Sequence, residues 1–287
     1  MTAAEPTNPG PIVVKLGGVA LEPGGAPDGL WAALASLHGR EPGGLVLAHG
    51  GAAAADRLLA DAGHTTERID GLRVTSDEQV DLVVAALAGL VSKRLVHRLT
   101  LAGARAAGIS LLDGPTVHAR RLAHPSGDLG RVGDPTGGDA SLTRALLAAG
   151  VLPVVASIAA DDDGFLNVNA DDAASALVTV LGARAALFLT TAPGVLDERG
   201  ELVPDATPAE LDDLIGRGVI AGGMIPKARA AIRAARDTGA PVTIASFQDP
   251  DTLERLAARE PVGTTVHPET ADHPKTPASP QPLDHRA

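Results

Sequence analysis

The chain has 287 residues, and its 24 basic and 35 acidic side chains give a formal net charge of −11. This excess of acids argues against nucleic acid or an anionic membrane surface as the main partner. The lack of cysteine excludes disulfides, thiolate catalysis and cysteine-ligated metal sites.

Apolar residues make up 45% of the chain, but the only aromatic side chains are Trp31, Phe165, Phe188 and Phe247. We therefore expect an aliphatic core. The sequence contains no uninterrupted apolar run of about 18 residues, so we predict no membrane span. The N-terminus lacks the basic and apolar regions of an export signal, so we expect a cytoplasmic protein.

In chain order, short β-branched runs alternate with long Ala- and Leu-rich segments, a pattern typical of a parallel sheet covered by helices. The predicted strands are 12–16, 45–49, 107–112, 151–156, 186–189 and 242–245. The predicted helices are 29–38, 53–62, 76–102, 138–149, 172–181, 208–217 and 227–238. The strands are continuously apolar, which predicts a sheet buried on both faces.

The remaining segments predict turns and tails. Residues 117–134 are polar and rich in turn formers, and they predict a hairpin or flap. Residues 1–11 and 267–287 predict a flexible N-terminal tail and a disordered C-terminal tail. Histidines of the second tail could bind a metal, but its composition favours disorder.

Two strands end in a pair of glycines, within IVVKLGG at 12–18 and LVLAHGG at 45–51. Backbone N–H groups after such strands can converge on a phosphate. Neither segment is a Walker loop or a G-x-G-x-x-G motif, and a glycine pair also fits an ordinary tight turn.

Only four of the 24 basic residues are lysines, namely Lys15, Lys93, Lys227 and Lys275. Lys15 lies at a predicted strand end, where its ammonium either reaches the surface or accompanies an anion. Lys227 begins a predicted helix and either points into a cleft or is solvated. Lys93 and Lys275 are interpreted as solvated charges.

A third polar cluster is NVNAD at 167–171, before an Ala-rich helix. Asp171 fits a helix N-cap or first turn, where the helix dipole stabilises a carboxylate. With Asn167 it could also orient a ligand amide and catalytic cations. Arg73 lies among apolar neighbours in GLRVT and suits bidentate capture of a carboxylate, although it could be an ordinary surface charge. The Asp-rich run 161–163 predicts a turn, and no metal site is predicted.

Six segments, taken in chain order, resemble the amino-acid kinase family, and within it the acetylglutamate kinases. They are VVKLGGVAL at 13–21, LAHGG at 47–51, GLRVT at 71–75, NVNAD at 167–171, LTTAPGVLD at 189–197 and IAGGMIPK at 220–227. The resemblance implies an α/β fold, a three-layer αβα sandwich with an open, mainly parallel eight-stranded sheet. It implies one domain over 12–266, with a substrate and dimerisation lobe at 12–157 and a nucleotide lobe at 158–266.

The resemblance also implies an activity, the phosphorylation of the side-chain carboxylate of N-acetyl-L-glutamate by ATP in arginine biosynthesis. Mg²⁺ would be carried by the nucleotide. A carboxylate is already a nucleophile, so such an enzyme needs positioning and charge neutralisation instead of a general base. Arginine-inhibited relatives in the family carry an additional N-terminal helix that links dimers into a ring, whereas about 11 residues broken by Pro and Gly precede the first predicted strand here. The resemblance therefore implies an arginine-insensitive homodimer.

The family motifs carry roles over to residues of this chain. Lys15 and Lys227 match the lysines that stabilise the transferring phosphoryl group, and Asp171 matches the aspartate that positions them. Gly18 and Gly51 match phosphoryl-binding glycines. The implied acyl-substrate residues are Gly50, Gly51, Ala52, Arg73 and Asn167. The implied nucleotide residues are Gly17, Thr190, Thr191, Gly194 and Lys227.

This chain departs from the family pattern at three places. Ala52 replaces a glycine, and because alanine tolerates positive φ poorly, we expect an adjusted loop and a smaller acyl pocket. Thr191 replaces an aspartate, and Ser92 with Lys93 replaces Asn-Lys. Two alternatives stay open, namely a kinase of a carrier-linked aminoadipate or glutamate, and a non-catalytic sensor. A carrier-linked substrate would favour a basic rim around the mouth of the substrate site. A non-catalytic sensor would not need Lys15, Lys227 and Asp171.

Overall fold

The structure is a computed structural model, and it describes residues 10–269. The predicted tails therefore lie outside the described residues, except at 10–11 and 267–269. There the backbone is tied to the domain, since Arg184 N–H donates to the Pro11 carbonyl at 3.0 Å and His267 N–H to the Ala206 carbonyl at 2.9 Å. Within residues 10–269, no helix is long and apolar enough to cross a membrane.

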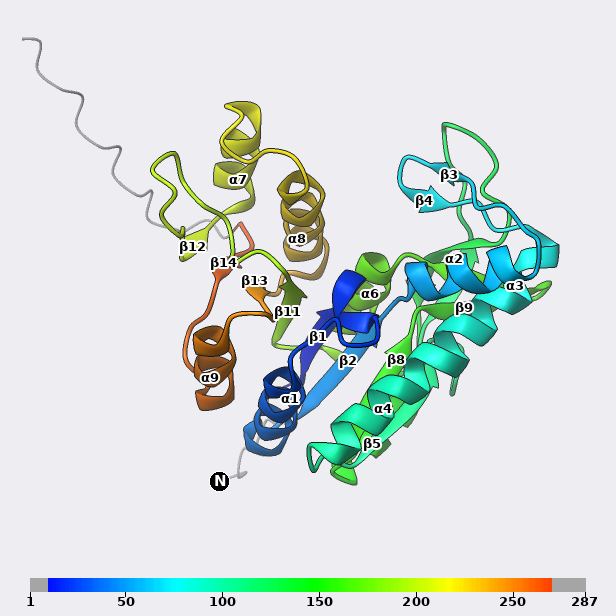
Figure 1. Cartoon of the computed structure of the whole chain (residues 1–287), viewed down its shortest axis with the longest axis horizontal. Coiled ribbons are helices and arrows are strands. Elements are labelled where there is room, and N and C mark those ends of the chain that lie inside the picture. Colours follow the sequence, from blue (N-terminus) through cyan, green and yellow to red (C-terminus); the bar gives the residue numbers. More distant parts are fainter. Residues whose placement is uncertain (1–9, 270–287) are drawn as a thin grey trace, which may run out of the picture.

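An eight-stranded sheet runs through the molecule (Figure 1). Its strands, in spatial order, are β12 (Asp205–Ala206), β14 (Thr264–Val266), β13 (Val242–Ser246), β11 (Ala185–Thr190), β1 (Ile12–Leu16), β2 (Leu45–His49), β8 (Leu152–Ala156) and β5 (Ala106–Ser110). Neighbouring strands are parallel, except that β14 runs antiparallel to β13. The prediction of an open, mainly parallel eight-stranded sheet is confirmed.

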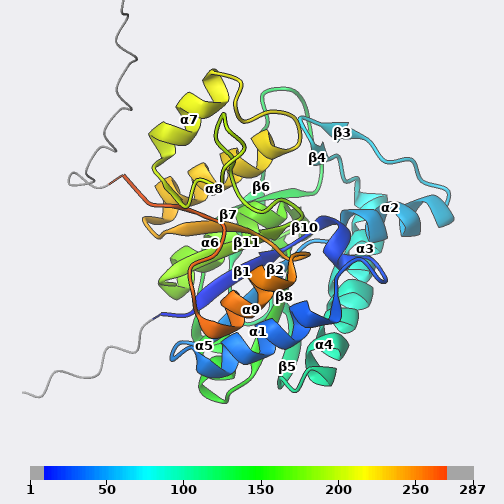
Figure 2. The same ribbon diagram turned by 60° about the vertical axis from the view of Figure 1, so that its left-hand side comes forward.

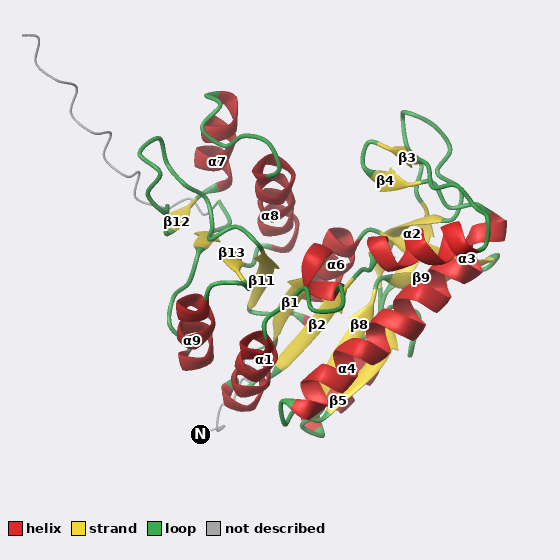
Figure 3. Cartoon of the chain, in the orientation of Figure 1, coloured by secondary structure: helices red, strands yellow, loops and turns green. Residues whose placement is uncertain are grey.

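Helices cover both faces of the sheet (Figure 3). One face packs on α1 (Asp28–Arg40), α4 (Ser92–Leu101) and α9 (Pro250–Ala258). The other face packs on α5 (Ser141–Ala148), α6 (Ala170–Leu181), α7 (Pro208–Gly216) and α8 (Met224–Thr238). Side chains alternate between faces, so Val13 joins the α6 and α8 side while Val14 joins the α1 side. The result is the expected three-layer sandwich, with α1 beside α9 (Figure 2).

Most predicted elements form, with differences at their ends. The strands 12–16 and 45–49 have the predicted bounds. The predicted helix 76–102 is one helical run of three parts, α3 (Asp77–Val84), a π-helical segment η2 (Ala85–Val91) and α4. The short strands β12 and β14 were not predicted, because two or three residues carry too little periodicity to recognise. The nine-residue helix α9 was also not predicted.

Smaller elements stand beyond the carboxyl ends of the central strands. They are η1 (Gly18–Leu21), α2 (Ala52–Asp61), the hairpin β3 (Arg68–Ile69) and β4 (Leu72–Arg73), and the sheet of β6 (His118–Arg121), β7 (Val132–Gly137), β10 (Gly164–Val168) and β9 (Ile158–Asp161). β6 and β7 pair antiparallel, so the predicted hairpin at 117–134 is confirmed. Figure 1 shows β3 and β4 standing out from the helices α2 and α3.

The topology marks a crevice between two neighbouring strands. The chain leaves β1 toward α1 on one face of the sheet. After β11 it passes through β12 to α7 and α8 on the other face. Ligands of open α/β sheets bind at the carboxyl ends of strands where connections diverge in this way. Gly17 follows β1 and Thr191 follows β11, so both lie at this switch point.

Candidate active site

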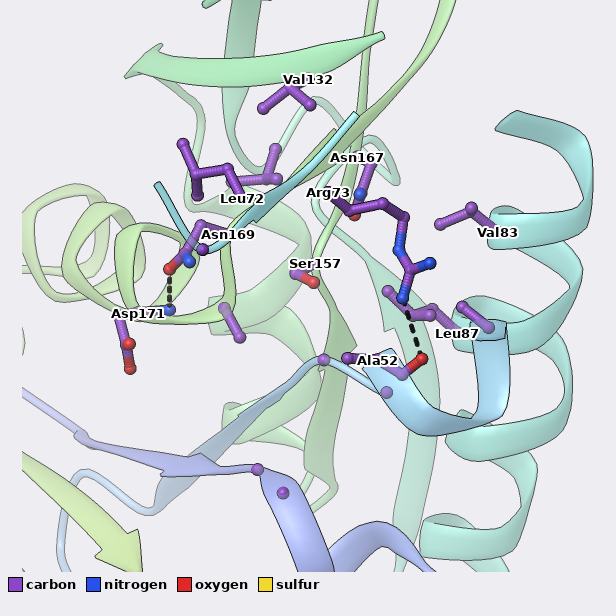
Figure 4. Close-up of a pocket in the computed structure, with 18 of the residues that line it drawn as sticks. Ala52, Leu72, Arg73, Val83, Leu87, Val132, Ser157, Asn167, Asn169 and Asp171 are labelled. Carbon is purple, nitrogen blue, oxygen red and sulfur yellow. Dashed lines mark hydrogen bonds between the residues drawn. The ribbon is translucent and has the colours of Figure 1, made fainter. Parts of the chain in front are cut away.

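Two cavities open at these strand ends, and they share one wall made of Lys15, Gly17, Gly18 and Asp171. The cavity that contains Arg73 is called here the Arg73 pocket (Figure 4). Its other lining residues include Gly50, Gly51, Ala52, Arg68, Leu72, Val83, Leu87, Ser157, Asn167 and Asn169. The second cavity is called the Lys227 pocket, and it adds Val19, Phe188, Thr190, Thr191, Pro226, Lys227, Ile244 and Phe247.

The shared wall is built on an ion pair between β1 and α6. Lys15 Nζ lies 2.8 Å from Asp171 Oδ1, and both side chains are half-buried. Asp171 lies in the first turn of α6, as predicted. The Asn169 side-chain oxygen caps that helix by accepting from the N–H groups of Asp171 at 2.8 Å and Asp172 at 3.3 Å. The cap fixes the turn that presents the Asp171 carboxylate (Figure 4).

Glycine is favoured by the backbone at the start of α2, and it leaves room for the ammonium after β1. A Cβ at Gly17 would lie 3.2 Å from Lys15 Nζ. Gly51, the N-cap residue of α2, has φ +153°, and a Cβ there would lie 3.0 Å from Val91 Cγ2. Both glycine pairs therefore let backbone N–H groups approach a ligand more closely than larger residues would.

His49, the last residue of β2, was given no role by the sequence. Its side chain is fully buried, and its Nδ1 lies 2.8 Å from the Gly50 carbonyl oxygen. Burial lowers the pKa of His49 to about 4, and the backbone hydrogen bond opposes this only in part. The ring is therefore neutral at pH 7 and donates from Nδ1 to Gly50.

Arg73 is buried, with 8% of its surface exposed. Its Nη1 donates to Asp56 Oδ1 at 2.6 Å and to Thr66 Oγ1 at 3.1 Å, and its Nη2 donates to the Ala52 carbonyl at 2.9 Å. Burial alone would raise the pKa of Asp56, but the hydrogen bonds from Arg73 and Arg68 lower it. These three bonds use three of the five guanidinium N–H groups, which leaves two donors for a ligand.

Asn167 on β10 reaches the same cavity (Figure 4). Its Nδ2 donates to Thr75 Oγ1 at 3.2 Å, and that hydroxyl donates to the Arg73 carbonyl at 3.2 Å. Ser157, which follows β8, also lines the cavity and was missed. A polar residue directly after a buried parallel strand was the signal that could have identified it.

The apolar part of the Arg73 pocket includes Leu72, Val83, Leu87 and Ala52. Val83 lies near the end of α3 and Leu87 lies in η2, and π-helical segments are frequent at functional sites. The adjusted loop expected at Ala52 presupposed a positive φ at this residue, which the structure does not have. Ala52 is the first residue of α2, and the positive φ value falls on Gly51 instead.

The charged group of the Lys227 pocket has fewer protein partners than those of the Arg73 pocket. Lys227 lies in the first turn of α8, which begins three residues before the predicted start at 227. Among residues 10–269 no carboxylate lies within ion-pair distance of Lys227, whereas Lys15 is paired. Thr190 and Thr191 follow from the end of β11, and the walls are mainly apolar.

The structure brings every predicted site residue to one of these pockets except Gly194. A Cβ at Gly194 would lie 2.7 Å from Thr264 Oγ1, so this glycine packs against β14. Within residues 10–269, no group of three or more His, Asp or Glu side chains is placed to hold a metal ion. Two ligands bound in these pockets would meet at an ammonium and several backbone N–H groups, which suits transfer of an anionic group.

Comparison with known proteins agrees with this geometry. A profile of the amino acid kinase family matches residues 10–246. The chain is 41% identical over 259 residues to a protein of Colwellia psychrerythraea named acetylglutamate kinase, covering 90% of this chain and 97% of that one. A protein of the same name from Aeromonas salmonicida is 40% identical over 256 residues, covering 89% and 97%.

A solved structure agrees as well. A crystal structure of a protein from Streptococcus mutans superposes with a TM-score of 0.68 at 29% identity, covering 90% of this chain and 98% of the other. The chain, with its two pockets on an eight-stranded sheet, belongs to the amino acid kinase family.

Proposed function

We propose that this protein transfers the γ-phosphoryl group of ATP to the side-chain carboxylate of N-acetyl-L-glutamate, a step of arginine biosynthesis. The products are N-acetyl-L-glutamyl 5-phosphate and ADP. The observation that carries the proposal is the wall shared by the two pockets, where Lys15 and Asp171 border both cavities. Relatives that are about 40% identical and are named acetylglutamate kinases support the choice of acceptor.

In this proposal the Arg73 pocket holds the acceptor. The two free guanidinium donors of Arg73 take the α-carboxylate, and the Asn167 amide bonds the acylamino group. The acetyl methyl group faces the apolar side chains on α3 and η2. The reacting carboxylate then points toward Lys15 and the two glycine pairs.

The Lys227 pocket holds the nucleotide. Its volume is about 370 Å³, against about 230 Å³ for the Arg73 pocket, which fits the larger substrate. Its apolar walls suit the adenosine, and the unpaired Lys227 ammonium meets the phosphates. Mg²⁺ enters with the nucleotide and is held by the phosphate oxygens.

The chemistry requires no proton transfer. An oxygen of the acceptor carboxylate forms a bond to the γ-phosphorus, while the bond from that phosphorus to the β–γ bridging oxygen breaks and ADP leaves. Lys15 and Lys227 neutralise the phosphoryl oxygens, and the N–H groups of Gly18 and Gly51 donate to them. Asp171 holds Lys15 in place and does not act as a base.

The experiment is an acyl-phosphate assay on the purified protein with ATP, in which hydroxylamine traps the product as a hydroxamate. We expect rapid turnover with N-acetylglutamate and little with free glutamate, which lacks the acyl amide. Activity only on a carrier-linked aminoadipate or glutamate would establish the first alternative instead. Binding of N-acetylglutamate without turnover on any acceptor would establish the sensor.

One observation weighs against the carrier-linked acceptor. Arg68, the exposed cation at the mouth of the Arg73 pocket, is paired with Asp56 at 2.7 Å. Asp56, which also pairs with Arg73, offsets part of this charge and so weakens the attraction of the mouth for an acidic carrier protein.

The proposal includes a cytosolic, arginine-insensitive homodimer. For the dimer, the support is two exposed leucines near the sheet edge, since Leu90 on η2 and Leu101 on α4 are 45% and 70% exposed and β5 is an edge strand. Light scattering tests the dimer, and a hexamer or inhibition by millimolar arginine contradicts it.

A further inference from the structure

The two glycines Gly50 and Gly51 of the Arg73 pocket are preceded by His49, which does not line that pocket. His49 is the last residue of β2, and its side chain is completely buried. Side chains alternate along a strand, so His49 points to the same face of the sheet as Leu47, which packs on α1 and α4. The ring is thus enclosed beneath the loop that carries Gly50 and Gly51.

The ring makes one hydrogen bond, and that bond reaches the loop. Nδ1 lies 2.8 Å from the Gly50 carbonyl oxygen, while Nε2 is buried without a hydrogen-bond partner in the described part of the chain. Because a carbonyl only accepts, the neutral ring must carry its proton on Nδ1.

This bond also determines where a backbone donor points. The Gly50 carbonyl and the Gly51 N–H belong to one peptide unit, and in a trans peptide the two groups point in opposite directions. The carbonyl is held toward the His49 ring, so the Gly51 N–H points away from it. Gly51 lines the Arg73 pocket, and its N–H has no acceptor among residues 10–269.

A hydrogen bond is needed here because glycine does not fix the peptide. Glycines on both sides leave this peptide unit free to rotate, since neither has a Cβ that favours one orientation. A rotated peptide would present a carbonyl oxygen to the phosphoryl group, which would repel it.

We propose that His49 is a positioning residue that locks the Gly50–Gly51 peptide, so that the Gly51 N–H is fixed toward the transferring phosphoryl group. The inference rests on the proposed function for the identity of that group. The histidine acts through the loop and does not touch either substrate.

The geometry is tested first without turnover, by long-range ¹H–¹⁵N spectra of the histidine rings in the full chain at pH 7. Comparison with a His49→Asn sample identifies the His49 resonances. We expect a protonated Nδ1 and an unprotonated Nε2. A proton on Nε2 would overturn the proposal whether or not the protein phosphorylates N-acetylglutamate.

Kinetics then test the consequence with three variants. His49→Asn keeps an amide donor near the position of Nδ1, His49→Gln moves it to the position of Nε2, and His49→Leu removes it. We expect kcat to fall about 10- to 100-fold in the Leu and Gln variants, as for the loss of one oriented donor. In His49→Asn it should stay within about 5-fold of wild type, and both KM values should change less than kcat in all three.

Leu47→Ala is the control for a purely structural effect, because it weakens the same strand without a hydrogen bond to the loop. It should lower stability and leave kcat near the wild-type value. Wild-type kcat in His49→Leu, or equal losses in the Asn and Leu variants, would overturn the positioning role. Should His49→Leu not fold, the comparison of the Asn and Gln variants decides the question. A wild type inactive on N-acetylglutamate instead contradicts the proposed function and leaves the NMR result standing.

Discussion

The two pockets differ in how their charged groups are held. In the Arg73 pocket the guanidinium is buried and bonded to Asp56, Thr66 and the Ala52 carbonyl. In the Lys227 pocket, Lys227 has no ion-pair partner among residues 10–269, and its neighbours are mainly apolar. One pocket is organised by the protein before a ligand arrives, while the other has a cation that a ligand must neutralise.

The difference matches the proposed ligands. A small acylamino acid offers few contacts, so its site gains affinity and orientation when the binding groups are already fixed. A nucleotide brings several negative charges with it, so an unpaired ammonium is neutralised only when the phosphates are present. Transfer takes place at the shared wall, where the ion pair of Lys15 with Asp171 belongs to both sites.

The largest expected effect is on the unpaired lysine. Lys227→Ala should lower kcat on the order of 10²-fold or more, because a preorganised positive charge is lost from the transferring group. Lys15→Ala should lower kcat similarly, and it also leaves Asp171 without its partner. Steady-state kinetics measure both, with Lys93→Ala on the exposed face of α4 as the matched control. Wild-type kcat in either variant contradicts its assigned role.

The buried ring under the Arg73 pocket predicts a pH dependence of stability. The pKa of His49 is about 4 in the folded protein, against the ordinary histidine value of 6.5 expected in the unfolded chain. On acidification the unfolded chain takes up this proton first, so the stabilisation is fully present above pH 6.5 and is lost as the pH falls toward 4. The loss is about 3 kcal/mol for this one group.

Urea unfolding between pH 7 and pH 4.5 measures this slope, and His49→Leu supplies the comparison. The variant should lose less stability than wild type over the same range. If the free energy of unfolding fell equally with pH in the two proteins, His49 would not be the cause of the pH dependence.

Arg73→Ala should weaken the binding of one substrate only. It should raise the KM for N-acetylglutamate about 10- to 100-fold, the value of a charge-assisted hydrogen bond, with the ATP KM nearly unchanged. Arg68→Ala, on the same hairpin but more exposed, should change either KM less than about 3-fold. An effect of Arg73→Ala on the ATP KM alone would assign this arginine to the other substrate.

Asp56→Asn tests whether the prior arrangement of the Arg73 pocket matters. The amide keeps an acceptor for Arg73 but removes the charge of a partly exposed ion pair, which is worth about 1 kcal/mol at most. We expect up to about a 5-fold rise in the acceptor KM. A lower KM would mean that Asp56 competes with the substrate for Arg73.

The smallest effect is expected at Ala52. This residue contacts Arg73 through its backbone carbonyl, and it has no positive φ. Ala52→Gly should therefore change the acceptor KM by less than about 2-fold and should lower stability by at most about 1 kcal/mol, through helix propensity. A larger gain in affinity would show that the methyl group restricts the pocket.

The sequence predicted the sheet well, because apolar runs such as 12–16 and 45–49 are buried on both faces and have sharp ends. It failed at β12 and β14, which form only through pairing with residues far along the chain. The positive φ that was expected at Ala52 lies one residue earlier, at Gly51. Which glycine of a run adopts that conformation is determined by where the next helix begins.

Motifs identified the shared wall, since Lys15 and Asp171 both lie next to recognisable turns. They did not identify Asp56, which reaches Arg73 from a helix surface with no distinguishing pattern. Gly194 follows a strand end as the motif predicts, yet it packs on β14 and not on a pocket. Such contacts depend on tertiary packing, which local sequence does not encode.

The most direct test of the two-pocket account is a crystal structure of the protein with N-acetylglutamate and a non-hydrolysable ATP analogue. The account predicts the acceptor in the Arg73 pocket with its α-carboxylate on Arg73. It also predicts the nucleotide phosphates on Lys227 and the acceptor side-chain carboxylate facing the terminal phosphate beside Lys15. A nucleotide in the Arg73 pocket, or substrates that do not meet at Lys15, would contradict it.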